Sequence, residues 1–427
     1  MNEAVKAIHT YGDLECKLGL ERIEELLRRL SNPHKGIRYI HVTGTNGKGS
    51  VCRYIYSVLK ENGYKAGIFT SPHIQFINER IEYDGKLISD EDLELCAEET
   101  YRNAKEMAED GFEPPTTFEI VAAVAFLYFK KIKAEYVVLE VGLGGRGDAT
   151  NIIENPLISV ITSVSLDHTD LLGNTLPLIA AEKAGIIKEG SPVVANVYDP
   201  EAAKVVEETA GRLKCDYYDV AEVKFKVVDK TLESYVFDTT ILGEEYKGLE
   251  IKMKGRHQIR NTITALTAIE VLRRDGLPGI TKDGIYRGFL NSHHIGRFEV
   301  LKENPYIIID GAHNEKGAEE LKNTMKEHFP GKKILIVTGM LKDKDVDKML
   351  GNLYEVADDF IATQPDNPRR MVAEEMAEKL KAAGKNCLAV LDPASACEKA
   401  EKLAPEYDAV VFAGSLYLLG DVRGYFV

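Results

Sequence analysis

Short apolar runs alternate with helical patterns along most of the 427 residues, and this alternation limits the possible folds more than any other feature of the chain. Four of the runs have the length and the β-branched content of buried parallel strands. They cover residues 66–70, 135–142, 157–165 and 191–197. Helical patterns lie between them at 118–132 and 176–189. This order predicts an α/β fold whose main sheet is doubly wound and mostly parallel.

The later part of the chain predicts a small addition and then a second domain. Residues 215–255 contain period-two stretches and turns, which are typical of antiparallel strands, and a helical pattern follows at 258–274. A second strand–helix series then contains PYIIIDGAHN, KKILIVTGM, DDFIATQP, NCLAVLD and DAVVFAGS. We place the boundary near 292–300, in NSHHIGRFEV. The prediction is a P-loop domain over residues 1–295 and a smaller Rossmann-like α/β domain over residues 296–427.

Composition and charge argue against several classes of protein. The net charge of −14 disfavours broad nucleic-acid binding, although it allows a local basic pocket. No apolar stretch is long enough to span a bilayer, and the first twenty residues lack the apolar core of a signal peptide. The six cysteines, at 16, 52, 96, 215, 387 and 397, contain no CxxC pair, so they indicate neither a zinc site nor a disulfide framework. We expect a monomeric cytoplasmic protein with no nucleic-acid or membrane partner.

The segment HVTGTNGKGS, residues 41–50, is close to a phosphate-binding loop but has an unusual spacing. In the common loop, four residues separate the first Gly from the Gly-Lys pair, and Ser or Thr follows Lys directly. Here only two residues separate Gly44 from Gly47 and Lys48, and a further glycine separates Lys48 from Ser50. The spacing alone therefore leaves open an ordinary glycine-rich turn.

The context of this segment favours phosphate binding. An apolar, β-branched run at 37–42 precedes it and a helical pattern at 51–59 follows it. Such a turn aims backbone N–H groups and a helix N-terminus at one point. Lys48 would add a positive charge for the β- and γ-phosphates, and Ser50 an oxygen for Mg²⁺. From these residues, a kinase, an ATPase and a ligase all stay open.

Polar residues follow several strand-like runs, at the edge where ligands gather in open α/β sheets. Ser71 follows GIFT, Glu140 lies near the end of YVVLE, and Asp167 and His168 come after VITSVS. Singly, Ser71 fits an ordinary turn and His168 fits a helix cap. Glu140 alone fits an ion pair with Arg146. Together, a hydroxyl, a carboxylate and an imidazole around phosphates predict a site for Mg²⁺ or Mn²⁺.

Two further features do not settle a function. The stretch EVGLGGRGDATN, residues 140–151, lacks the GxGxxG pattern of a dinucleotide site, so its glycines are expected to let backbone approach a ligand or a loop. Arg146 and Asp148 would project polar groups from it. Lys183 lies among alanines on a helical pattern, where its charge would ordinarily reach solvent. Beside the proposed cation it would be repelled unless it lost its charge, and the residues leave both interpretations open.

Eight segments resemble, in order and spacing, those of the folylpolyglutamate synthase and dihydrofolate synthase family, a branch of the Mur ligases. They are GTNGKGS, FTSPHI, TTFEI, LEVGLGGRGDATN, DHTDLLGNTLPLIAAEKAGIIK, GRHQIRN, IIDGAHN and TQPDNPRRM. The resemblance extends from the first strand to GSLYLLGDVR near the C-terminus. It identifies the short glycine segment as the phosphate loop of this family.

The resemblance implies an enzyme that forms an amide bond at the expense of ATP. ATP would phosphorylate a carboxylate of the pteridine substrate, and the amino group of L-glutamate would attack the resulting acyl phosphate. ADP and phosphate would leave. Mg²⁺ and in-line positioning would supply most of the catalysis. The expected substrates are ATP, L-glutamate and a reduced folate or dihydropteroate.

The resemblance also implies site residues. The expected ATP-binding residues are Gly47, Lys48, Gly49, Ser50, Asn261, Arg297 and Asp310. The expected Mg²⁺ ligands are Ser71, Glu140 and His168. Lys48, His168 and Lys183 would act in catalysis, and Lys183 matches a lysine that CO₂ carbamylates in this family, which would turn a repelled cation into an anion. The expected substrate-binding residues are Thr116, Thr117, Phe118, Glu119, Gly147, Asp148 and Ala149 for the pterin, and His313 and Ser415 for glutamate.

The chain departs from the family pattern at two places. The family commonly has Leu at the position of Gly147, so the wall of the pterin pocket is expected to be looser here. It commonly has an aromatic residue before the Pro/Ile-Gly-Arg of the hinge, where this chain has SHHIGR. The second departure leaves Arg297 in place but changes what packs in the hinge.

Two rival functions and one choice of substrate stay open. A Mur ligase of cell-wall synthesis would carry an N-terminal domain, for which a loop strand that starts near residue 37 leaves no room. A nucleotide-binding switch without ligase chemistry would need neither Lys183 nor a second α/β domain. The sequence does not decide between tetrahydrofolate and dihydropteroate as the acceptor.

Overall fold

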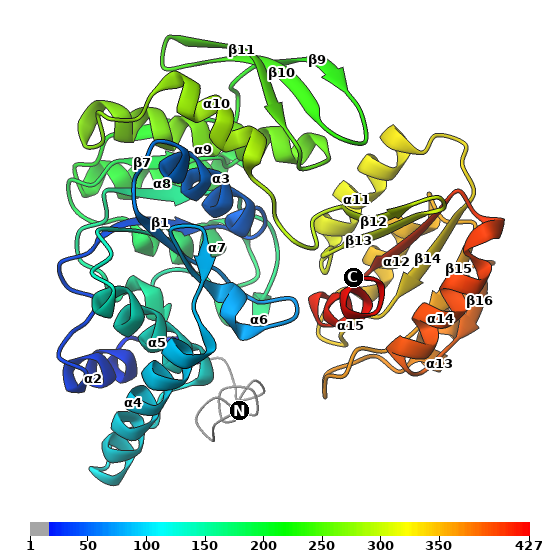
Figure 1. The fold of residues 1–427 in the computed structure, drawn as a ribbon, viewed down its shortest axis with the longest axis horizontal. Coiled ribbons are helices and arrows are strands. Elements are labelled where there is room, and N and C mark those ends of the chain that lie inside the picture. The colour runs from blue at the N-terminus through cyan, green and yellow to red at the C-terminus, as the bar shows by residue number, and fades with distance from the viewer. Residues whose placement is uncertain (1–16) are drawn as a thin grey trace.

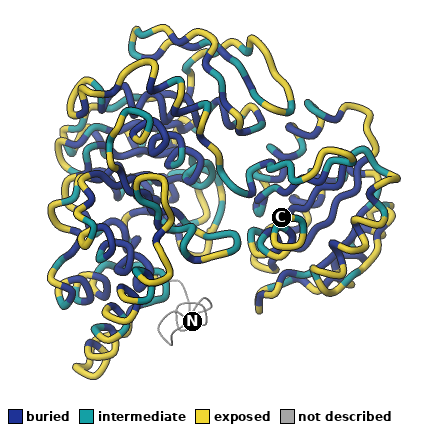
Figure 2. The backbone as a smooth tube through the Cα atoms, viewed as in Figure 1, coloured by how far each residue is buried: buried dark blue, intermediate teal, exposed yellow. Residues whose placement is uncertain are grey.

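The computed structural model describes residues 17–427 and contains two α/β domains side by side (Figure 1). The first sixteen residues, which include Cys16 and the start of the predicted first domain, lie outside the described residues. In both domains, buried strands form the centre and helices cover them (Figure 2). Between residues 17 and 427, no helix is long and apolar enough to cross a membrane.

An eight-stranded sheet with the order β4-β3-β2-β5-β1-β6-β7-β8 forms the first domain. Its strands are β1 (Arg38–Thr43), β2 (Ala66–Phe69), β3 (Ile81–Tyr83), β4 (Lys86–Leu87), β5 (Tyr136–Glu140), β6 (Ile158–Ile161), β7 (Val193–Ala195) and β8 (Tyr217–Asp219). β1 lies between β5 and β6, where Ile40 pairs in parallel with Val138 and Ile158. Only β3 and β4, at one edge, run antiparallel. The predicted α/β fold with a mostly parallel sheet is confirmed.

Helices cover both faces of this sheet because its strands are apolar on both faces. The helices are α2 (Glu21–Arg29), α3 (Lys48–Glu61), α4 (Asp90–Glu109), α5 (Thr117–Lys131), α6 (Thr169–Leu172), α7 (Leu176–Lys183), α8 (Pro200–Arg212), α9 (Arg256–Asp275) and α10 (Lys282–Asn291). On one face, α3, α9 and α10 pack with Ile40 and Val42. On the other, α2, α4 and α5 pack with Tyr39 and Leu139. The neighbouring residues of β1 thus serve two separate cores.

The helix predicted at 176–189 is wrong in its length, because α7 ends at Lys183. A short 3₁₀ turn, Ala184–Ile186, follows it. The amide of Arg146 donates a hydrogen bond to the carbonyl of Glu182 over 2.8 Å, and Gly185 packs against Arg146, where a Cβ would lie 2.6 Å from its Cα. The chain therefore leaves the helix to make room for the second glycine-rich stretch.

The antiparallel addition predicted for 215–255 is confirmed only in part. β9 (Phe225–Lys230), β10 (Tyr235–Ile241) and β11 (Glu244–Ile251) form a three-stranded antiparallel sheet. Alternate residues of β10, among them Tyr235 and Phe237, are buried in the core that contains α9. Residues 217–219, in contrast, form β8, which pairs in parallel with β7. Its three residues are too few to show a period that distinguishes the two kinds of strand.

The second domain has a six-stranded sheet with the order β12-β13-β17-β14-β15-β16, parallel except for β12. Its strands are β12 (Glu299–Glu303), β13 (Tyr306–Asp310), β14 (Ile334–Thr338), β15 (Asp359–Ala362), β16 (Asn386–Ala389) and β17 (Ala409–Ala413). Its helices are α11 (Glu315–His328), α12 (Val346–Tyr354), α13 (Ala373–Ala382), α14 (Pro393–Leu403) and α15 (Leu416–Phe426). The chain passes from one domain to the other between the end of α10 and the start of β12, which makes residues 292–298 the link (Figure 1).

A polar contact away from the link also joins the domains. Glu327 on α11 accepts hydrogen bonds from Lys230 over 2.6 Å and from the Tyr235 hydroxyl over 2.8 Å. Arg256 lies 3.4 Å from the same carboxylate. The Tyr235 ring also packs edge-on against His328. The three-stranded sheet therefore reaches α11 of the second domain.

Helix α10 packs on α3 at a glycine, and this contact allows a test of the fold. A Cβ at Gly288 would lie 2.5 Å from the Val58 Cα, whereas nothing lies within 4 Å of a Cβ at Gly211 on α8. We expect Gly288→Ala to lower the free energy of unfolding by about 1–3 kcal/mol, because the two helices must move apart. Gly211→Ala, the control, should leave it unchanged or raise it by up to about 1 kcal/mol. Thermal and urea unfolding followed by circular dichroism measures both; equal stability of the two variants would contradict this packing.

Candidate active site

The glycine segment forms a loop between β1 and α3, and neighbouring segments contact this loop on two sides. Gly47 precedes α3 with a φ of 85°, in the left-handed region, and a Cβ there would lie 2.4 Å from Asn261 Oδ1. On the other side, the Asn46 amide donates to Ser163 Oγ over 2.9 Å, and Thr162 Oγ1 donates to the Asn46 carbonyl over 2.6 Å. The N-terminus of α3 is therefore held open toward the space between the domains, as an anion site requires.

This loop lines a cavity of about 850 Å³ between the two domains. The cavity gathers most of the site residues predicted from the sequence. These are Gly47, Lys48, Gly49, Ser50, Ser71, Glu140, His168, Lys183, Asn261, Arg297, Asp310, His313 and Ser415. Residues that are far apart in the chain thus meet in one place, at the carboxyl ends of the strands of both sheets.

Lys48 and Ser50 are the two polar side chains of the first turn of α3. The Lys48 ammonium donates to the carbonyls of Gly44 over 3.1 Å and Thr45 over 3.2 Å, so it curls back over the loop. Ser50 Oγ accepts from Gln258 Nε2 over 3.3 Å and lies 3.4 Å from the Nδ1 of His294. A positive charge and a hydroxyl therefore flank the helix N-terminus.

Glu140 and Ser71 lie together at the ends of β5 and β2. The Ser71 amide donates to Glu140 Oε2 over 2.9 Å. Burial raises the pKa of the Glu140 carboxyl, and Lys48 is the strongest of the charges that oppose this shift. The proposed ion pair with Arg146 is absent, because Arg146 lies beside Glu182 instead. A buried carboxylate without an arginine partner, next to a hydroxyl residue, suits a hard cation such as Mg²⁺.

The third predicted metal ligand, His168, lines the same cavity but faces Asp167. Its Nε2 lies 3.8 Å from Asp167 Oδ1. The residue precedes α6 in the left-handed region, with a φ of 49°, and its side chain does not cap the helix. Within residues 17–427, no three side chains of His, Cys, Asp and Glu gather as a metal cluster. A cation would therefore rest on Glu140, hydroxyl groups and phosphate oxygens, with His168 at most as a further ligand.

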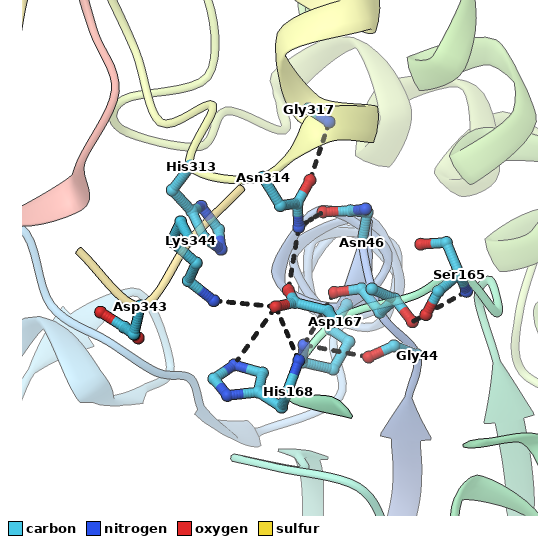
Figure 3. A network of polar contacts seen from close by, with 12 residues as sticks. Gly44, Asn46, Ser165, Asp167, His168, His313, Asn314, Gly317, Asp343 and Lys344 are labelled. Carbon is cyan, nitrogen blue, oxygen red and sulfur yellow. Dashed lines mark hydrogen bonds and ion pairs between the residues drawn. The ribbon is translucent and has the colours of Figure 1, made fainter. Parts of the chain in front are cut away.

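A polar network around Asp167 crosses from one domain to the other (Figure 3). Asp167 accepts from Lys344 over 2.8 Å and from Asn314 over 3.0 Å, both in the second domain. Asn314 also donates to Asn46 of the loop over 3.1 Å. Burial alone would raise the pKa of Asp167, but Lys344 and His168 hold it well below its usual range. The network ties the phosphate loop to the second domain.

Sequence reasoning missed Lys344 and Asn314. Asn314 is the last residue of the segment IIDGAHN, which carries part of the family resemblance. It caps α11 by accepting a hydrogen bond from the Gly317 amide over 2.8 Å. An Asn before a helical pattern is a signal that sequence analysis can find. Lys344 lies in a charged stretch, LKDKD, with no pattern that separates a buried lysine from a solvated one.

Lys183 is buried at the end of α7, with its side chain in the cavity wall. This excludes the interpretation as a lysine whose charge lies in solvent. Burial, together with the positive charge of Lys48, lowers the pKa of the Lys183 ammonium to about 7. A large fraction of Lys183 is therefore the neutral, nucleophilic amine at neutral pH.

The second domain contributes Arg297, Asp310 and His313 to the opposite wall. Arg297 Nη1 donates to the Gly311 carbonyl over 3.3 Å. Asp310 accepts from the amides of Phe298 and Ala312, each over 2.9 Å, and burial raises its pKa. Burial lowers the pKa of His313 to about 4, so its imidazole is neutral.

Two more predicted site residues line the cavity, Asn261 from the first domain and Ser415 from the second. Asn261 on α9 donates to Gln258 over 3.1 Å and lies beside Gly47. Ser415 caps α15 by accepting from the Tyr417 amide over 3.2 Å. Both are buried, so each has a fixed side chain toward the cavity.

The residues predicted for the pterin lie behind the cavity wall. Thr116 and Glu119 form a capping box at the start of α5, and Glu119 is paired with the buried Arg22 over 3.1 Å. The Phe118 ring lies over Gly142, where a Cβ would be 2.4 Å away. Gly142 itself lines the cavity. These residues, with Thr117 at the first position of α5, support the wall from behind.

The other residues predicted to bind the pterin, Gly147, Asp148 and Ala149, also lie behind the cavity wall. Buried Asp148 accepts from the amide of Leu143, a cavity residue, over 2.8 Å. The prediction that the pocket wall is looser at Gly147 is wrong. A Cβ at this position would lie 2.9 Å from the Gly19 amide nitrogen and 3.0 Å from the Leu18 Cβ. The space that a larger side chain would occupy is filled by the segment before α2.

The fold and the site define a Mur ligase: the Mur ligase middle domain matches residues 42–269, and the Mur ligase glutamate ligase domain matches residues 296–416. The chain is 37% identical over 422 residues to the dihydrofolate synthase/folylpolyglutamate synthase of Bacillus subtilis, which covers 97% of this chain and 96% of the relative. The chain belongs to the folylpolyglutamate synthase and dihydrofolate synthase family, and is accordingly an ATP-dependent ligase.

Two solved structures are similar to the whole chain. Folylpolyglutamate synthase of Mycobacterium tuberculosis, complexed with ADP and AMPPCP, is 30% identical with a TM-score of 0.89, and the match covers 100% of this chain and 99% of the other. FolC of Escherichia coli, in complex with DHPP and ADP, is 30% identical with a TM-score of 0.86 and a coverage of 99% and 97%. The two-domain arrangement is thus shared along the full length of these proteins.

The position of Lys48 allows a direct test of the phosphate loop. Its ammonium lies at the cavity next to the N-terminus of α3, where charge on a transferred phosphoryl group would develop. We expect Lys48→Ala to reduce turnover by at least about 10²-fold while the protein stays folded. Lys60→Ala, at the exposed end of the same helix, is the matched control and should keep full activity. ADP release measured in both variants decides the matter, and near-normal turnover in Lys48→Ala would remove the loop from the chemistry.

Proposed function

We propose that this protein joins L-glutamate to a reduced folate in two steps. The γ-phosphoryl group of ATP passes to a carboxylate oxygen of the folate, which gives an acyl phosphate and ADP. The glutamate nitrogen then bonds to the carbonyl carbon, the C–O bond to phosphate breaks, and the amine gives up a proton. The observation that carries the proposal is the single interdomain cavity in which the glycine loop, Glu140 and Lys183 meet.

In this proposal the glycine loop and the second domain hold ATP from two sides. The amides at the start of α3 and the Lys48 ammonium would bind the phosphates. Asn261 supports the loop at Gly47, and Arg297 and Asp310 face it from beyond the link. Two domains that close on one nucleotide exclude water, which would otherwise hydrolyse the acyl phosphate.

Magnesium fits the residues on the first-domain side of the cavity. Ser50, Ser71 and Glu140 would hold it, with His168 as a further ligand, because they offer hydroxyl, carboxylate and imidazole groups around the phosphate position. The bound cation would neutralise phosphate charge during transfer. His313 and Ser415, on the second domain, are the residues we assign to the glutamate side. All of these residues belong to one chain, so the proposal needs no second subunit and no macromolecular partner, and it suits a monomer in the cytoplasm.

We also propose that Lys183 carries a carbamate. Its neutral amine would bond to the carbon of CO₂ and release one proton, which leaves an anionic carbamate near the positive charge of Lys48. Because the pKa of Lys183 is about 7, the reactive amine is depleted as the pH falls below 7. Carbamate occupancy should therefore rise with pH through this range.

This modification can be observed directly. In ¹³C-bicarbonate, the protein should show one carbamate carbon by NMR that Lys183→Ala lacks. Lys188→Ala, whose partly buried amine bonds to the Asn151 carbonyl, is the matched control and should keep the signal. Lys183→Ala should be nearly inactive, and added formate or acetate should restore part of the turnover by supplying a carboxylate. If the wild-type protein converts folate but shows no carbamate signal, the proposed modification is refuted.

The proposal also specifies which substrate accepts the glutamate. We assign tetrahydrofolate as the acceptor, with dihydropteroate as a second one. The two share the pterin ring and differ in whether a glutamate already extends from the benzoate, so contacts to the ring cannot separate them. Discrimination must come from the position of the reacting carboxylate relative to the γ-phosphate.

The test supplies ATP, Mg²⁺ and L-glutamate with each acceptor in turn and measures ADP and product mass. We expect glutamylation of tetrahydrofolate and a slower glutamylation of dihydropteroate. Reaction with tetrahydrofolate alone would make the protein a dedicated polyglutamate synthase. Reaction with neither would overturn the folate assignment in favour of a cell-wall Mur ligase, and nucleotide binding without any ADP production would favour a switch.

A further inference from the structure

The hinge histidine His294 lies directly on the phosphate loop. It belongs to the link between the domains, which comprises residues 292–298. Its ring covers Gly49, where a Cβ would lie 2.5 Å from the His294 Cε1. Its Nδ1 lies 3.4 Å from the Ser50 hydroxyl. A residue of the link is therefore in contact with a group that we assign to magnesium.

The hydrogen bonds around Ser50 limit the directions in which its hydroxyl hydrogen can point. The Asn261 Nδ2 donates to Gln258 Oε1 over 3.1 Å, so Gln258 turns its amide N–H₂ to Ser50 Oγ, 3.3 Å away. Ser50 Oγ accepts there and has its own hydrogen left to donate. A neutral imidazole with its proton on Nε2 has Nδ1 as an acceptor. With His294 in this tautomer, the Ser50 hydrogen points to Nδ1, and one lone pair of Ser50 Oγ stays free.

That free lone pair is what a cation needs from a serine. A hydroxyl bound to Mg²⁺ must turn its hydrogen away from the ion. Gln258 occupies one lone pair and His294 takes the hydrogen, so the hydroxyl is held in one orientation before any ion arrives. Second-layer hydrogen bonds of this kind orient metal ligands and raise metal affinity.

We propose that His294 is a positioning residue for the metal site, in which its Nδ1 accepts the Ser50 hydroxyl hydrogen and turns the oxygen to the phosphate-bound cation. The proposal rests on the proposed function, since it takes Ser50 as a magnesium ligand. It also gives the link between the domains a direct contact with the cation site.

The test measures magnesium binding without turnover. The full chain is saturated with a non-hydrolysable ATP analogue and titrated with Mg²⁺ in a calorimeter. His294→Phe keeps a ring over Gly49 but removes the acceptor, and should raise the apparent Kd for Mg²⁺ about tenfold, the scale of one hydrogen bond. His294→Asn, whose Oδ1 replaces Nδ1, should stay within about threefold of the wild type. Affinity for the analogue without Mg²⁺ should be unchanged in both.

Ser50→Ala separates the two levels of the proposal. It should weaken Mg²⁺ at least as much as His294→Phe does, and His294→Phe should have no further effect in the Ser50→Ala background. If Ser50→Ala leaves Mg²⁺ binding unchanged, the metal assignment of the proposed function is wrong. If Ser50→Ala weakens binding but His294→Phe does not, or if the two effects add, the role of His294 is overturned and the metal assignment stands. Thermal unfolding checks each variant; should His294→Phe not fold, His294→Gln takes its place, because its amide reaches the Nε2 position.

Discussion

The shape of the phosphate loop depends on close approaches that only glycine permits. Thr162 at the end of β6 lies against Gly44, Asn261 of α9 against Gly47, and the link residue His294 against Gly49. Each of these contacts would be blocked by a Cβ. Three different parts of the chain thus contact one short turn. The loop is shaped from outside as much as by its own sequence.

The interior of the cavity holds ionisable groups at a real cost in solvation, and this is the mark of a chemical site. Burial raises the pKa of Glu140 and of Asp310 and lowers that of Lys183. A fold selected for stability alone would replace such groups by apolar ones. The cation that we propose beside Glu140 and the carbamate that we propose on Lys183 would reduce these costs. Empty and filled states of the cavity should therefore differ in stability as well as in activity.

The sequence predicted the sheet, the loop and the set of cavity residues because these depend on local periodicity and on motifs. It did not predict contacts between segments that lie far apart in the chain. In the sequence, Lys344 has no feature that distinguishes it from a surface lysine, although the fold pairs it with Asp167. Gly147 suggested a looser pocket wall, but Leu18 occupies the space beside it. The early end of α7 is of the same kind, because a carbonyl of the helix is taken by a loop residue. Local patterns carry no record of such partners.

The contact of Glu327 with Lys230 and Tyr235 gives the three-stranded sheet a mechanical meaning. It joins the domains at a place separate from the covalent link at 292–298. The network of Asp167 with Lys344 and Asn314 connects the domains at a third place. Separation of the two domains must therefore break the polar contacts of both Glu327 and Asp167, so the small sheet adds to the cost of opening the cavity.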